Sequence, residues 1–461
     1  MSNIGEYLNG RSVFITGASG FLGKVLLEKL LRDCSGLKRI FILLRAKGGL
    51  QSRKRIHELL DSLVFDRVRR ENPSLLEKVV PISGDIIYRG LGINPSDLAV
   101  LRDEVSIVFH IAATIRFDEP LKRAVNLNVG GTKHVLELCH QLKHIQALVH
   151  VSTAYCNTEK CDVKENIYHE SIPANKILDA VEWMDDDILE SLSHHLFAGR
   201  PSSYHYTKAL AENLLIEDGK DLNIAVIRPS IITAAWKEPF PGWIDNYYGP
   251  TGYLVVSGKG VLRTMHVHKE KICDMVPVDI VANALIVGAW FVGTKKSGQI
   301  QVFNCTSGGL NPITWSQIKE ISSPLLIKNP SMELFRYPGS SFHSNRLVHE
   351  LFLQLEHNIP AFFIDFLFKI TGHKPILSQI YQKVHRAINA LEYFTTNEWT
   401  FITDNFLTLL NEMSEEDKNI FYADVRRINW QSYMESYVLG VRRFLLKEDP
   451  STIPEARKRL Q

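Results

Sequence analysis

Short apolar runs of β-forming residues alternate with segments of helical periodicity through the first half of this 461-residue chain. The runs are apolar along their length rather than at every second residue, which is typical of parallel strands covered by helices on both faces. The pattern therefore predicts an α/β fold with a doubly wound parallel sheet. In such a sheet, ligands bind outside the carboxyl ends of the strands, at the switch point between the first and fourth. The expected strands are Ser12–Thr16, Arg39–Leu44, Val79–Ser83, Ser106–Ile111, Ala147–Val151 and Ile224–Ile227.

The second part of the chain has a different pattern. A turn-rich break at Asn304–Pro312 is followed by helical segments, such as Ile376–Tyr393 and Asn405–Leu410, with apolar residues three and four apart. We expect a nucleotide-binding and substrate domain over residues 1–335. A C-terminal, mostly helical domain is expected over residues 336–461.

Two apolar stretches come nearest to the pattern of a membrane segment. Val281–Gly293 is too short to span a bilayer and is expected to be a buried core helix. Ile359–Ile370 contains Asp365 and Lys369 within twelve residues, so it is not expected to span either.

Composition excludes several classes of protein. Lys and Arg number 53 against 51 Asp and Glu, a formal charge of +2, which gives no footprint for nucleic acid. Six cysteines without a CxxC pair fit neither a disulfide framework nor a zinc site, so no metal is expected. The N-terminus has no signal-peptide pattern, which predicts synthesis in the cytosol. The stretch after Arg442 is basic and suits either a solvated helix end or an anionic lipid surface.

The strongest local signal lies where the first strand meets a helix over Lys24–Arg32. Between them stands G-x-x-G-x-x-G. In this motif the first glycine permits a tight turn, the second lets the backbone approach a pyrophosphate, and the third lets the helix close on the strand. A glycine turn without a nucleotide is the alternative, but the flanking strand and helix favour a Rossmann-type dinucleotide site. Its expected contacts are Thr16, Gly17, Ser19, Gly20, Phe21, Leu22 and Gly23.

Arg45 follows the second strand, where an NAD enzyme would hold the ribose 2′-hydroxyl with an acidic residue. A guanidinium there can clamp a 2′-phosphate, so the expected cofactor is NADPH. A solvated arginine at the strand end is the alternative. Further cofactor contacts are expected where the third, fourth and sixth strands end, from Asp85, Ala112, Ala113, Thr114, Pro229 and Ser230.

Tyr204 and Lys208 are the leading catalytic candidates. Their spacing of four puts both on one face of a helix. A tyrosine with a pKa near 10 is a poor proton donor and acceptor at neutral pH, and a nearby ammonium stabilises the phenolate. Lys208 can also hold the nicotinamide ribose hydroxyls. At the end of the fifth strand, Thr153, or as second choice Ser152, can hold a substrate carbonyl oxygen; capping of the backbone is the alternative.

These motifs occur in the order found in the extended short-chain dehydrogenase/reductase superfamily, which the chain resembles. Asn128–Thr132 is similar to that group's asparagine motif and adds Asn128 to the expected cofactor contacts. More specifically, the chain resembles the animal alcohol-forming fatty acyl-CoA reductases. The segments that carry this likeness are Leu26–Leu31, Glu182–Asp187, Tyr206–Glu212, Arg228–Ile232, Trp236–Asp245, Gly249–Arg263, Leu391–Phe394 and Asp424–Trp430, so it covers nearly the whole chain.

The resemblance implies that a long-chain acyl-CoA is reduced to a primary alcohol with two NADPH, through an enzyme-held aldehyde. The first hydride collapses the thioester through a hemithioacetal, and the second reduces the aldehyde. It further implies that Tyr204 donates the proton, that Lys208 tunes it, and that Thr153 or Ser152 holds the oxygen.

The resemblance also implies a membrane surface as a partner. Members of the family usually continue into a C-terminal hydrophobic anchor, which these 461 residues do not contain. The expected location is the cytosolic face of the peroxisomal membrane, with the endoplasmic reticulum as the alternative. The sequence does not indicate an oligomeric state.

Substrate contacts are expected from an aromatic, proline-bounded run after the sixth strand. Trp236, Phe240 and Trp243 can supply an apolar wall for an acyl chain, since each buried methylene is worth about 0.8 kcal/mol. The alternative is that these aromatics pack a domain junction.

Two other functions would use part of this sequence. A related reductase acting on a sterol or flavonoid ketone would not need Trp236–Asp245 or the helical region, and a silent NADPH-binding scaffold would not need Tyr204 and Lys208.

Overall fold

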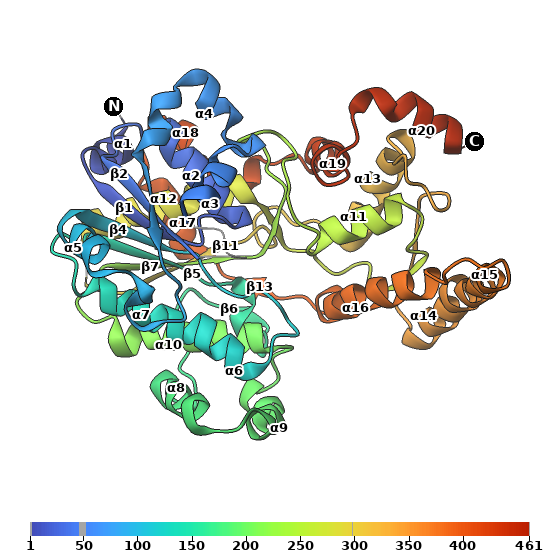
Figure 1. Ribbon diagram of the computed structural model, residues 1–461, viewed down its shortest axis with the longest axis horizontal. Coiled ribbons are helices and arrows are strands. Elements are labelled where there is room, and N and C mark those ends of the chain that lie inside the picture. Colours follow the sequence, from blue (N-terminus) through green and yellow to red (C-terminus); the bar gives the residue numbers. More distant parts are fainter. Residues whose placement is uncertain (1, 46–51, 297, 461) are drawn as a thin grey trace. The chain divides into compact units, whose positions relative to one another are not determined.

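The computed structural model describes residues 2–45, 52–296 and 298–460 (Figure 1). The chain forms two compact units, each assembled from three segments. Unit 1 comprises Met1–Ile232, Val276–Gly309 and Trp399–Val425; unit 2 comprises Thr233–Met275, Leu310–Glu398 and Arg426–Gln461. This division differs from the linear boundary expected after residue 335, because the chain passes between the units several times.

A seven-stranded parallel sheet is the centre of unit 1, in the order β11-β7-β5-β4-β1-β2-β3. The predicted doubly wound fold is confirmed, and β1 and β4 are neighbours at the switch point. All six predicted strands are present, but the seventh was missed because its last residues were assigned to the turn-rich break. The strands are β1 (Ser12–Thr16), β2 (Arg39–Leu44), β3 (Val79–Ser83), β4 (Val105–His110), β5 (Ala147–Val151), β7 (Ile224–Pro229) and β11 (Gln301–Cys305).

Helices cover both faces of this sheet, as the continuously apolar strands require (Figure 1). The helices α2 (Phe21–Asp33) and α12 (Val278–Lys295) pack together on one face, and α7 (Gly131–Cys139) and α10 (Ser203–Asp218) lie on the other. The remaining helices of the first 232 residues are α1 (Asn3–Leu8), α3 (Ser52–Leu60), α4 (Asp66–Glu71), α5 (Pro95–Glu104), α6 (Leu121–Ala124), α8 (Ala174–Trp183) and α9 (Asp186–Phe197). Short 3-10 or π turns lie at Leu63–Phe65, Pro73–Lys78, Arg89–Gly92, Val125–Gly130 and Ala154–Asn157.

The helix α12 is, within the described ranges, the one helix long and apolar enough to cross a membrane by length and composition. It contacts β5, β7 and α2, and 78% of the helix is buried. The predicted core helix at Val281–Gly293 is thus confirmed.

The segment Trp399–Val425 returns to unit 1 from the C-terminal part of the chain. It carries β13 (Thr400–Phe401), which pairs with β6 (Asp162–Val163), and the helices α17 (Asp404–Asn411) and α18 (Glu415–Ile420). The Glu165 carboxylate accepts hydrogen bonds from the backbone N–H groups of Asn405 and Phe406, which fixes the start of α17.

Unit 2 is mostly helical. The chain leaves unit 1 in β8 (Ile231–Thr233) and returns in β10 (Met275–Pro277). Within unit 2, β9 (Thr264–His266) and β12 (Ser341–His343) pair in parallel. The helices are α11 (Pro250–Gly258), α13 (Trp315–Lys328), α14 (Arg346–Leu353), α15 (Ile359–Ile370), α16 (Leu377–Thr396), α19 (Trp430–Gly440) and α20 (Ile453–Leu460), with π turns at Gln354–Asn358 and Val441–Leu445 and 3-10 turns at Val425–Arg427 and Pro450–Thr452.

Candidate active site

The glycine turn has the close backbone contacts that its motif predicts. Gly17 has a positive φ of 78°, and a Cβ there would lie 2.7 Å from the backbone N of Ala112. A Cβ on Gly23 would lie 2.2 Å from the Gly17 carbonyl oxygen. Side chains are therefore excluded where β1 turns into α2 beside the end of β4, while Ser19 and Gly20 at the tip of the turn are exposed. Phe21 begins α2, and Leu22 points into the core.

The ends of β2 and β3 bring Arg45 and Asp85 together. Leu44 and Ser83 are register partners, and the Arg45 Nη1 lies 4.0 Å from the Asp85 Oδ2. The Arg45 side chain is 59% exposed, so a salt bridge at this distance leaves its guanidinium accessible to an anionic ligand.

The end of β4 is held by Asn128 in the π turn before α7. The Asn128 Oδ1 accepts the Thr114 N–H at 2.9 Å, and its Nδ2 donates to the Thr114 carbonyl oxygen at 3.2 Å. The same Nδ2 donates to the Thr207 hydroxyl on α10 at 2.9 Å. Asn128 thus ties the loop of Ala112, Ala113 and Thr114 to α10. This is a positioning contact, and a direct cofactor contact by Asn128 stays a prediction.

Two hydroxyls follow β5. Thr153 accepts the Tyr155 N–H at 3.3 Å and also hydrogen bonds with Tyr204. Ser152 is buried, and its hydroxyl has no hydrogen-bond partner among the described residues. The structure therefore places Thr153 beside the leading catalytic candidate.

Tyr204 stands in the first turn of α10, where the Phe117 ring stacks on it with a centroid separation of 5.8 Å. Burial raises the pKa of Tyr204 above its usual value, and the hydrogen bond with Thr153 opposes that rise. Tyr204 is therefore a neutral phenol near pH 7, the form that can donate a proton.

Lys208 lies one turn further along α10 and is buried. Its Nζ donates to the Val151 carbonyl oxygen at 2.7 Å, so the ammonium is bonded to the end of β5 rather than to the Tyr204 hydroxyl. Burial lowers the pKa of Lys208 to about 8, against the opposing effect of Glu212. The tuning of Tyr204 by Lys208 stays a prediction.

A buried ion pair behind Lys208 was not anticipated. Glu212, the next residue in the same helical row, accepts from the Arg228 Nε at 2.8 Å and Nη2 at 2.5 Å, and both side chains are almost fully buried. Arg228 also donates to the carbonyl oxygens of Lys164 and Asn166. The four-residue spacing from Lys208 to Glu212 indicates that the two share a helix face. Only the fold shows that Arg228 of β7 is the partner of Glu212.

Two buried histidines also escaped the sequence analysis. His110 and His150 are register partners on β4 and β5, with ring centroids 5.3 Å apart. The His110 Nδ1 lies 2.8 Å from the Thr16 hydroxyl. Burial, assisted by Lys208, lowers the pKa of His110 to about 3 and that of His150 well below its usual range. Both rings are therefore neutral at pH 7 and add no charge beside Lys208.

The end of β7 provides the last predicted cofactor contacts. Pro229 pairs with Cys305 of β11, and the Ser230 N–H donates to the Cys305 carbonyl oxygen at 3.2 Å. The Ser230 hydroxyl is buried and, like that of Ser152, has no partner in the described part of the chain.

The residues of this site fit a dinucleotide. A glycine cradle that Cβ atoms would fill lies at the switch point, and two buried hydroxyls without partners, those of Ser152 and Ser230, follow the neighbouring strands β5 and β7. Buried polar groups are normally hydrogen-bonded, so these two are suited to a bound polar group.

The predicted substrate residues lie in unit 2. Trp243 is buried, the Phe240 ring stacks on Phe444, and the Lys237 ammonium lies over the Trp236 ring. A Cβ on Gly242, within the same run, would lie 2.0 Å from the Ser436 carbonyl oxygen, so the run packs closely on α19. These contacts all lie within unit 2 and do not decide between the two expectations, so a substrate role for the three aromatics stays a prediction.

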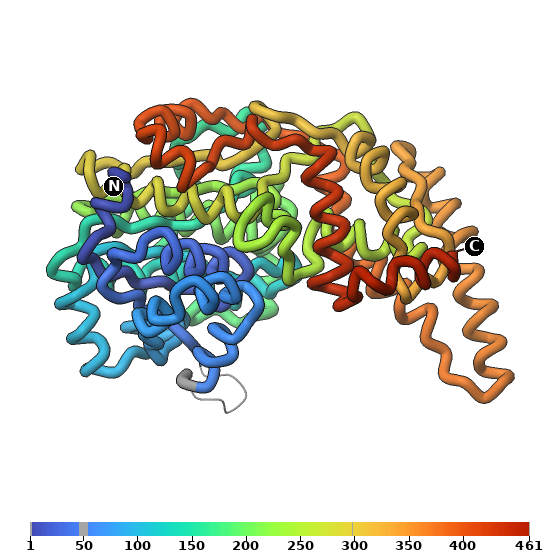
Figure 2. Tube along the Cα trace, turned by 90° about the horizontal axis from the view of Figure 1, so that it is seen from above, coloured from blue at the N-terminus to red at the C-terminus, as the bar shows by residue number. Residues whose placement is uncertain are grey.

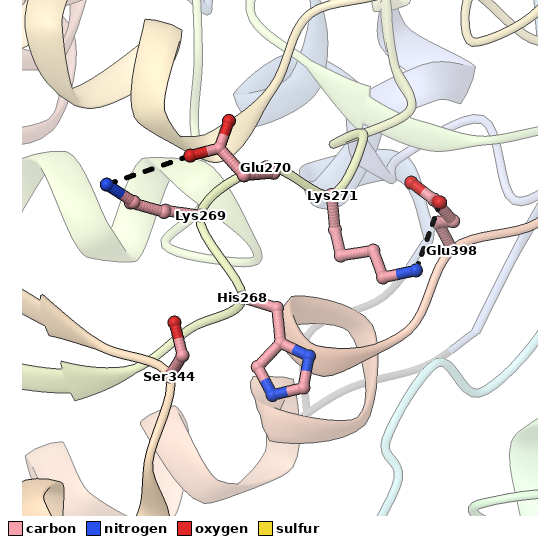
Figure 3. Close-up of a pocket in the computed structure, with 6 residues that line it drawn as sticks. All are labelled: His268, Lys269, Glu270, Lys271, Ser344 and Glu398. Atoms are coloured by element: carbon pink, nitrogen blue, oxygen red, sulfur yellow. Dashed lines mark hydrogen bonds and ion pairs between the residues drawn. The ribbon is translucent and has the colours of Figure 1, made fainter.

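A separate pocket in unit 2 contains none of the predicted residues (Figure 3). Its charged groups pair with each other, Lys269 with Glu270 and Lys271 with Glu398. Across residues 2–45, 52–296 and 298–460 no three His, Cys, Asp or Glu side chains are grouped as a metal site would need.

Two family models, both described as male sterility protein, match the chain: an NAD-binding model over residues 15–285 and a second over residues 356–448. Fatty acyl-CoA reductase 1 of Rattus norvegicus is 40% identical over 460 residues, 100% of this chain and 89% of the relative. That of Gallus gallus is 42% identical with the same coverage, and fatty acyl-CoA reductase 2 of Bos taurus is 39% identical over 461 residues, covering 100% and 90%.

Solved structures share the fold. The terminal R domain of the myxalamid biosynthetic pathway has a TM-score of 0.63 at 17% identity and covers 95% of this chain and 93% of its own. The reductase domain of a nonribosomal peptide synthetase from Mycobacterium tuberculosis has a TM-score of 0.59 at 17% identity, covering 96% and 95%.

The fold and the glycine cradle define a nicotinamide-dinucleotide-binding reductase domain of the extended short-chain dehydrogenase/reductase type. The chain belongs to the fatty acyl-CoA reductase family, as the full-length identity shows.

Proposed function

We propose that this protein reduces long-chain fatty acyl-CoA to a primary fatty alcohol with NADPH and releases CoA. The observation that carries the proposal is the hydrogen-bonded pair of Tyr204 and Thr153, one helical turn from Lys208, at the sheet edge that holds the glycine cradle. Family membership over the whole chain supports this substrate class over a sterol or small ketone.

NADPH, when bound, supplies the hydride for each reduction. The backbone at Gly17, Gly20 and Gly23 would hold the pyrophosphate, and the exposed Arg45 guanidinium would hold the 2′-phosphate. The buried hydroxyl of Ser230 would receive the carboxamide.

The chain's own residues would handle the substrate oxygen. Thr153 and Tyr204 would both donate to the carbonyl oxygen, where negative charge develops as the carbon is reduced. Tyr204 would then transfer its proton, and the Lys208 ammonium, held by Val151, would stabilise the resulting phenolate. Ser152 is the alternative to Thr153.

One site can serve both reductions because each adds hydride to a carbonyl carbon. The hemithioacetal formed first returns its hydroxyl proton to the Tyr204 phenolate as CoA thiolate leaves, which gives the aldehyde. The aldehyde is then reduced in turn while the same donors hold its oxygen. The run that contains Trp236, Phe240 and Trp243 would line the acyl chain. We place the reaction, on the family resemblance, at the cytosolic face of the peroxisomal membrane, with the endoplasmic reticulum as the alternative.

The test is to incubate the purified chain with NADPH and acyl-CoAs of increasing length, and to separate the aldehyde and alcohol products. Alcohol formation that rises with chain length and then plateaus supports the proposal, and Trp243→Ala should flatten that preference if the aromatic run lines the chain. Reduction of sterol or small ketones in preference to acyl-CoA would overturn it.

A further inference from the structure

A continuous helical segment of unit 2 exposes an unusually long row of apolar side chains. The helix α14 continues through the π turn Gln354–Asn358 into α15, so Arg346–Ile370 forms one helical path of about 37 Å. Exposed apolar residues recur along it every three or four positions, the period of one helix face. This apolar stripe consists of Leu347, Leu351, Leu355, Ile359, Phe362, Phe363, Phe366, Leu367 and Ile370.

The opposite side of α15 is already occupied. Ala361 packs with Leu377 and Tyr381 of α16 in a small buried cluster. The Asp365 carboxylate accepts the backbone N–H groups of Ile376, Leu377 and Ser378 at 2.8–3.0 Å, which caps the start of α16. The orientation of α15 on α16 is thus fixed, and it directs the stripe outwards.

The base of this arrangement is fixed as well. The His357 Nε2 accepts the Arg263 N–H at 2.9 Å, and its Nδ1 lies 2.9 Å from the His385 Nε2. The Tyr381 ring stacks on His357. The antiparallel pair of α15 and α16 projects beyond the neighbouring helices of unit 2 (Figure 2), so its outer face is sterically accessible.

The exposure of the stripe is large for a soluble surface. Phe362 is 65% exposed and Ile370 is 66% exposed. Monomeric proteins rarely expose continuous apolar patches of this kind, and those that do use them as interaction sites. The path is long, but it carries Glu350 and Glu356, and among the described helices α12 alone is long and apolar enough to cross a bilayer. A helix with one apolar face can instead lie in the plane of the membrane interface.

The charges on the hairpin Ile359–Arg386 indicate the partner. It carries four exposed cations, Lys369, Lys374, Lys383 and Arg386, and Asp365 is its one carboxylate. That carboxylate is used in the helix cap. Two further carboxylates, Glu350 and Glu356, lie on the helical path before the hairpin; Glu350 pairs with Arg346, and Glu356 pairs with Arg263 and Arg336, so they do not neutralise the cations of the hairpin. A second copy of the chain would bring like charges together, whereas an anionic lipid surface would match them.

We propose that the apolar stripe and the cations of this hairpin form an interfacial docking site for an anionic lipid bilayer. The phenylalanines of α15 enter the acyl boundary, and the lysines remain at the headgroups. This proposal does not depend on the proposed reaction, because none of these residues belongs to the candidate active site.

The test measures binding of the 461-residue chain to vesicles of phosphatidylcholine with about one third phosphatidylserine, and to vesicles of phosphatidylcholine alone. The chain should float with the anionic vesicles, and raised salt should weaken binding. Phe362→Ser/Phe366→Ser should reduce partitioning at least about tenfold. Lys369→Gln/Lys374→Gln should reduce it about fivefold or more on anionic vesicles only.

The matched control is Leu63→Ser/Trp183→Ser, which removes two apolar side chains of similar exposure from unit 1 and should leave vesicle binding unchanged. Melting temperatures of all variants should equal that of the parent chain. The proposal would be overturned if the phenylalanine variant and the control variant lost vesicle binding equally, or if the phenylalanine variant lost none. Absence of binding by the parent chain would also overturn it.

A site-specific probe provides a second measurement in case the Phe362→Ser/Phe366→Ser variant does not fold. Cys161 is the exposed one of the six cysteines, so Cys161→Ser/Phe366→Cys can carry a polarity-sensitive fluorophore on the stripe. Its emission should shift to the blue on anionic vesicles. An unshifted emission would contradict bilayer docking. A shift produced by raising the protein concentration without vesicles would also contradict it, because it would show that a second copy covers the stripe.

Discussion

The helix α10 and the helical path from α14 to α15 carry rows of residues at the same four-residue spacing. One row packs against the sheet, and the other is exposed. On α10, Tyr204, Lys208 and Glu212 face the sheet, and each has a polar partner there. On α14 and α15, the row that includes Leu351 and Phe363 faces outwards. Periodicity therefore predicts a helix and its faces, but only the tertiary fold decides what covers each face.

The largest expected effect falls on the α10 row. Tyr204→Phe keeps the ring and removes the hydroxyl that bonds to Thr153, so acyl-CoA turnover should fall by about 10²–10⁴ while NADPH affinity is retained. Steady-state kinetics and cofactor titration check this. Near-normal turnover would move the proton donor elsewhere, with Thr153 as the first residue to examine.

The second effect is on stability. Glu212→Gln leaves the fully buried Arg228 guanidinium without its counter-charge, which should lower the free energy of unfolding by about 3–5 kcal/mol. Denaturant unfolding measures the loss. The double variant Glu212→Leu/Arg228→Met is the control and should recover a large part of it; a double variant as unstable as the single one would contradict this account of the pair.

A third, smaller effect concerns cofactor choice. Arg45→Ala removes a charge-assisted contact to the 2′-phosphate worth roughly 1.5–3 kcal/mol, so NADPH affinity should fall by about 10–150-fold with little change for NADH. Lys38→Ala, another exposed cation of unit 1, serves as the control. Equal losses for the two cofactors would remove Arg45 from the site.

The smallest effect is expected on the exposed row. Phe363→Ser should change the free energy of unfolding by no more than about 0.5 kcal/mol, because the side chain is already in solvent. Leu377→Ala, on the buried side of the same hairpin, should cost about 2–5 kcal/mol. Thermal unfolding measures both losses, and equal losses would show that Phe363 is packed as closely as Leu377.

The sequence predicted the sheet well because its strands are continuously apolar and the glycine turn marks the first crossover. It missed β11, whose residues Asn304 and Cys305 adjoin a turn-rich stretch. It also placed Asn405–Leu410 in a C-terminal domain, whereas Glu165 holds that helix in unit 1. Contacts between segments that are distant in sequence leave no local pattern.

The candidate site shows the same limit. Spacing alone put Tyr204 and Lys208 on one face, and Thr153 follows the predicted end of β5. The Lys208 bond to Val151, the Glu212 pair with Arg228, and the Asn128 tie to Thr207 each join atoms of different elements. A motif specifies residue types in order, but not which atoms they meet.

We propose that one site carries out both reductions of a fatty acyl-CoA. The direct measurement is the ratio of NADPH consumed to CoA thiol released, with the lipid product identified in the same reaction. We expect two NADPH to be consumed for each CoA released, fatty alcohol to be the product, and both steps to be lost together in Tyr204→Phe. One NADPH for each CoA with free aldehyde as the final product, or NADPH oxidation without CoA release, would contradict it.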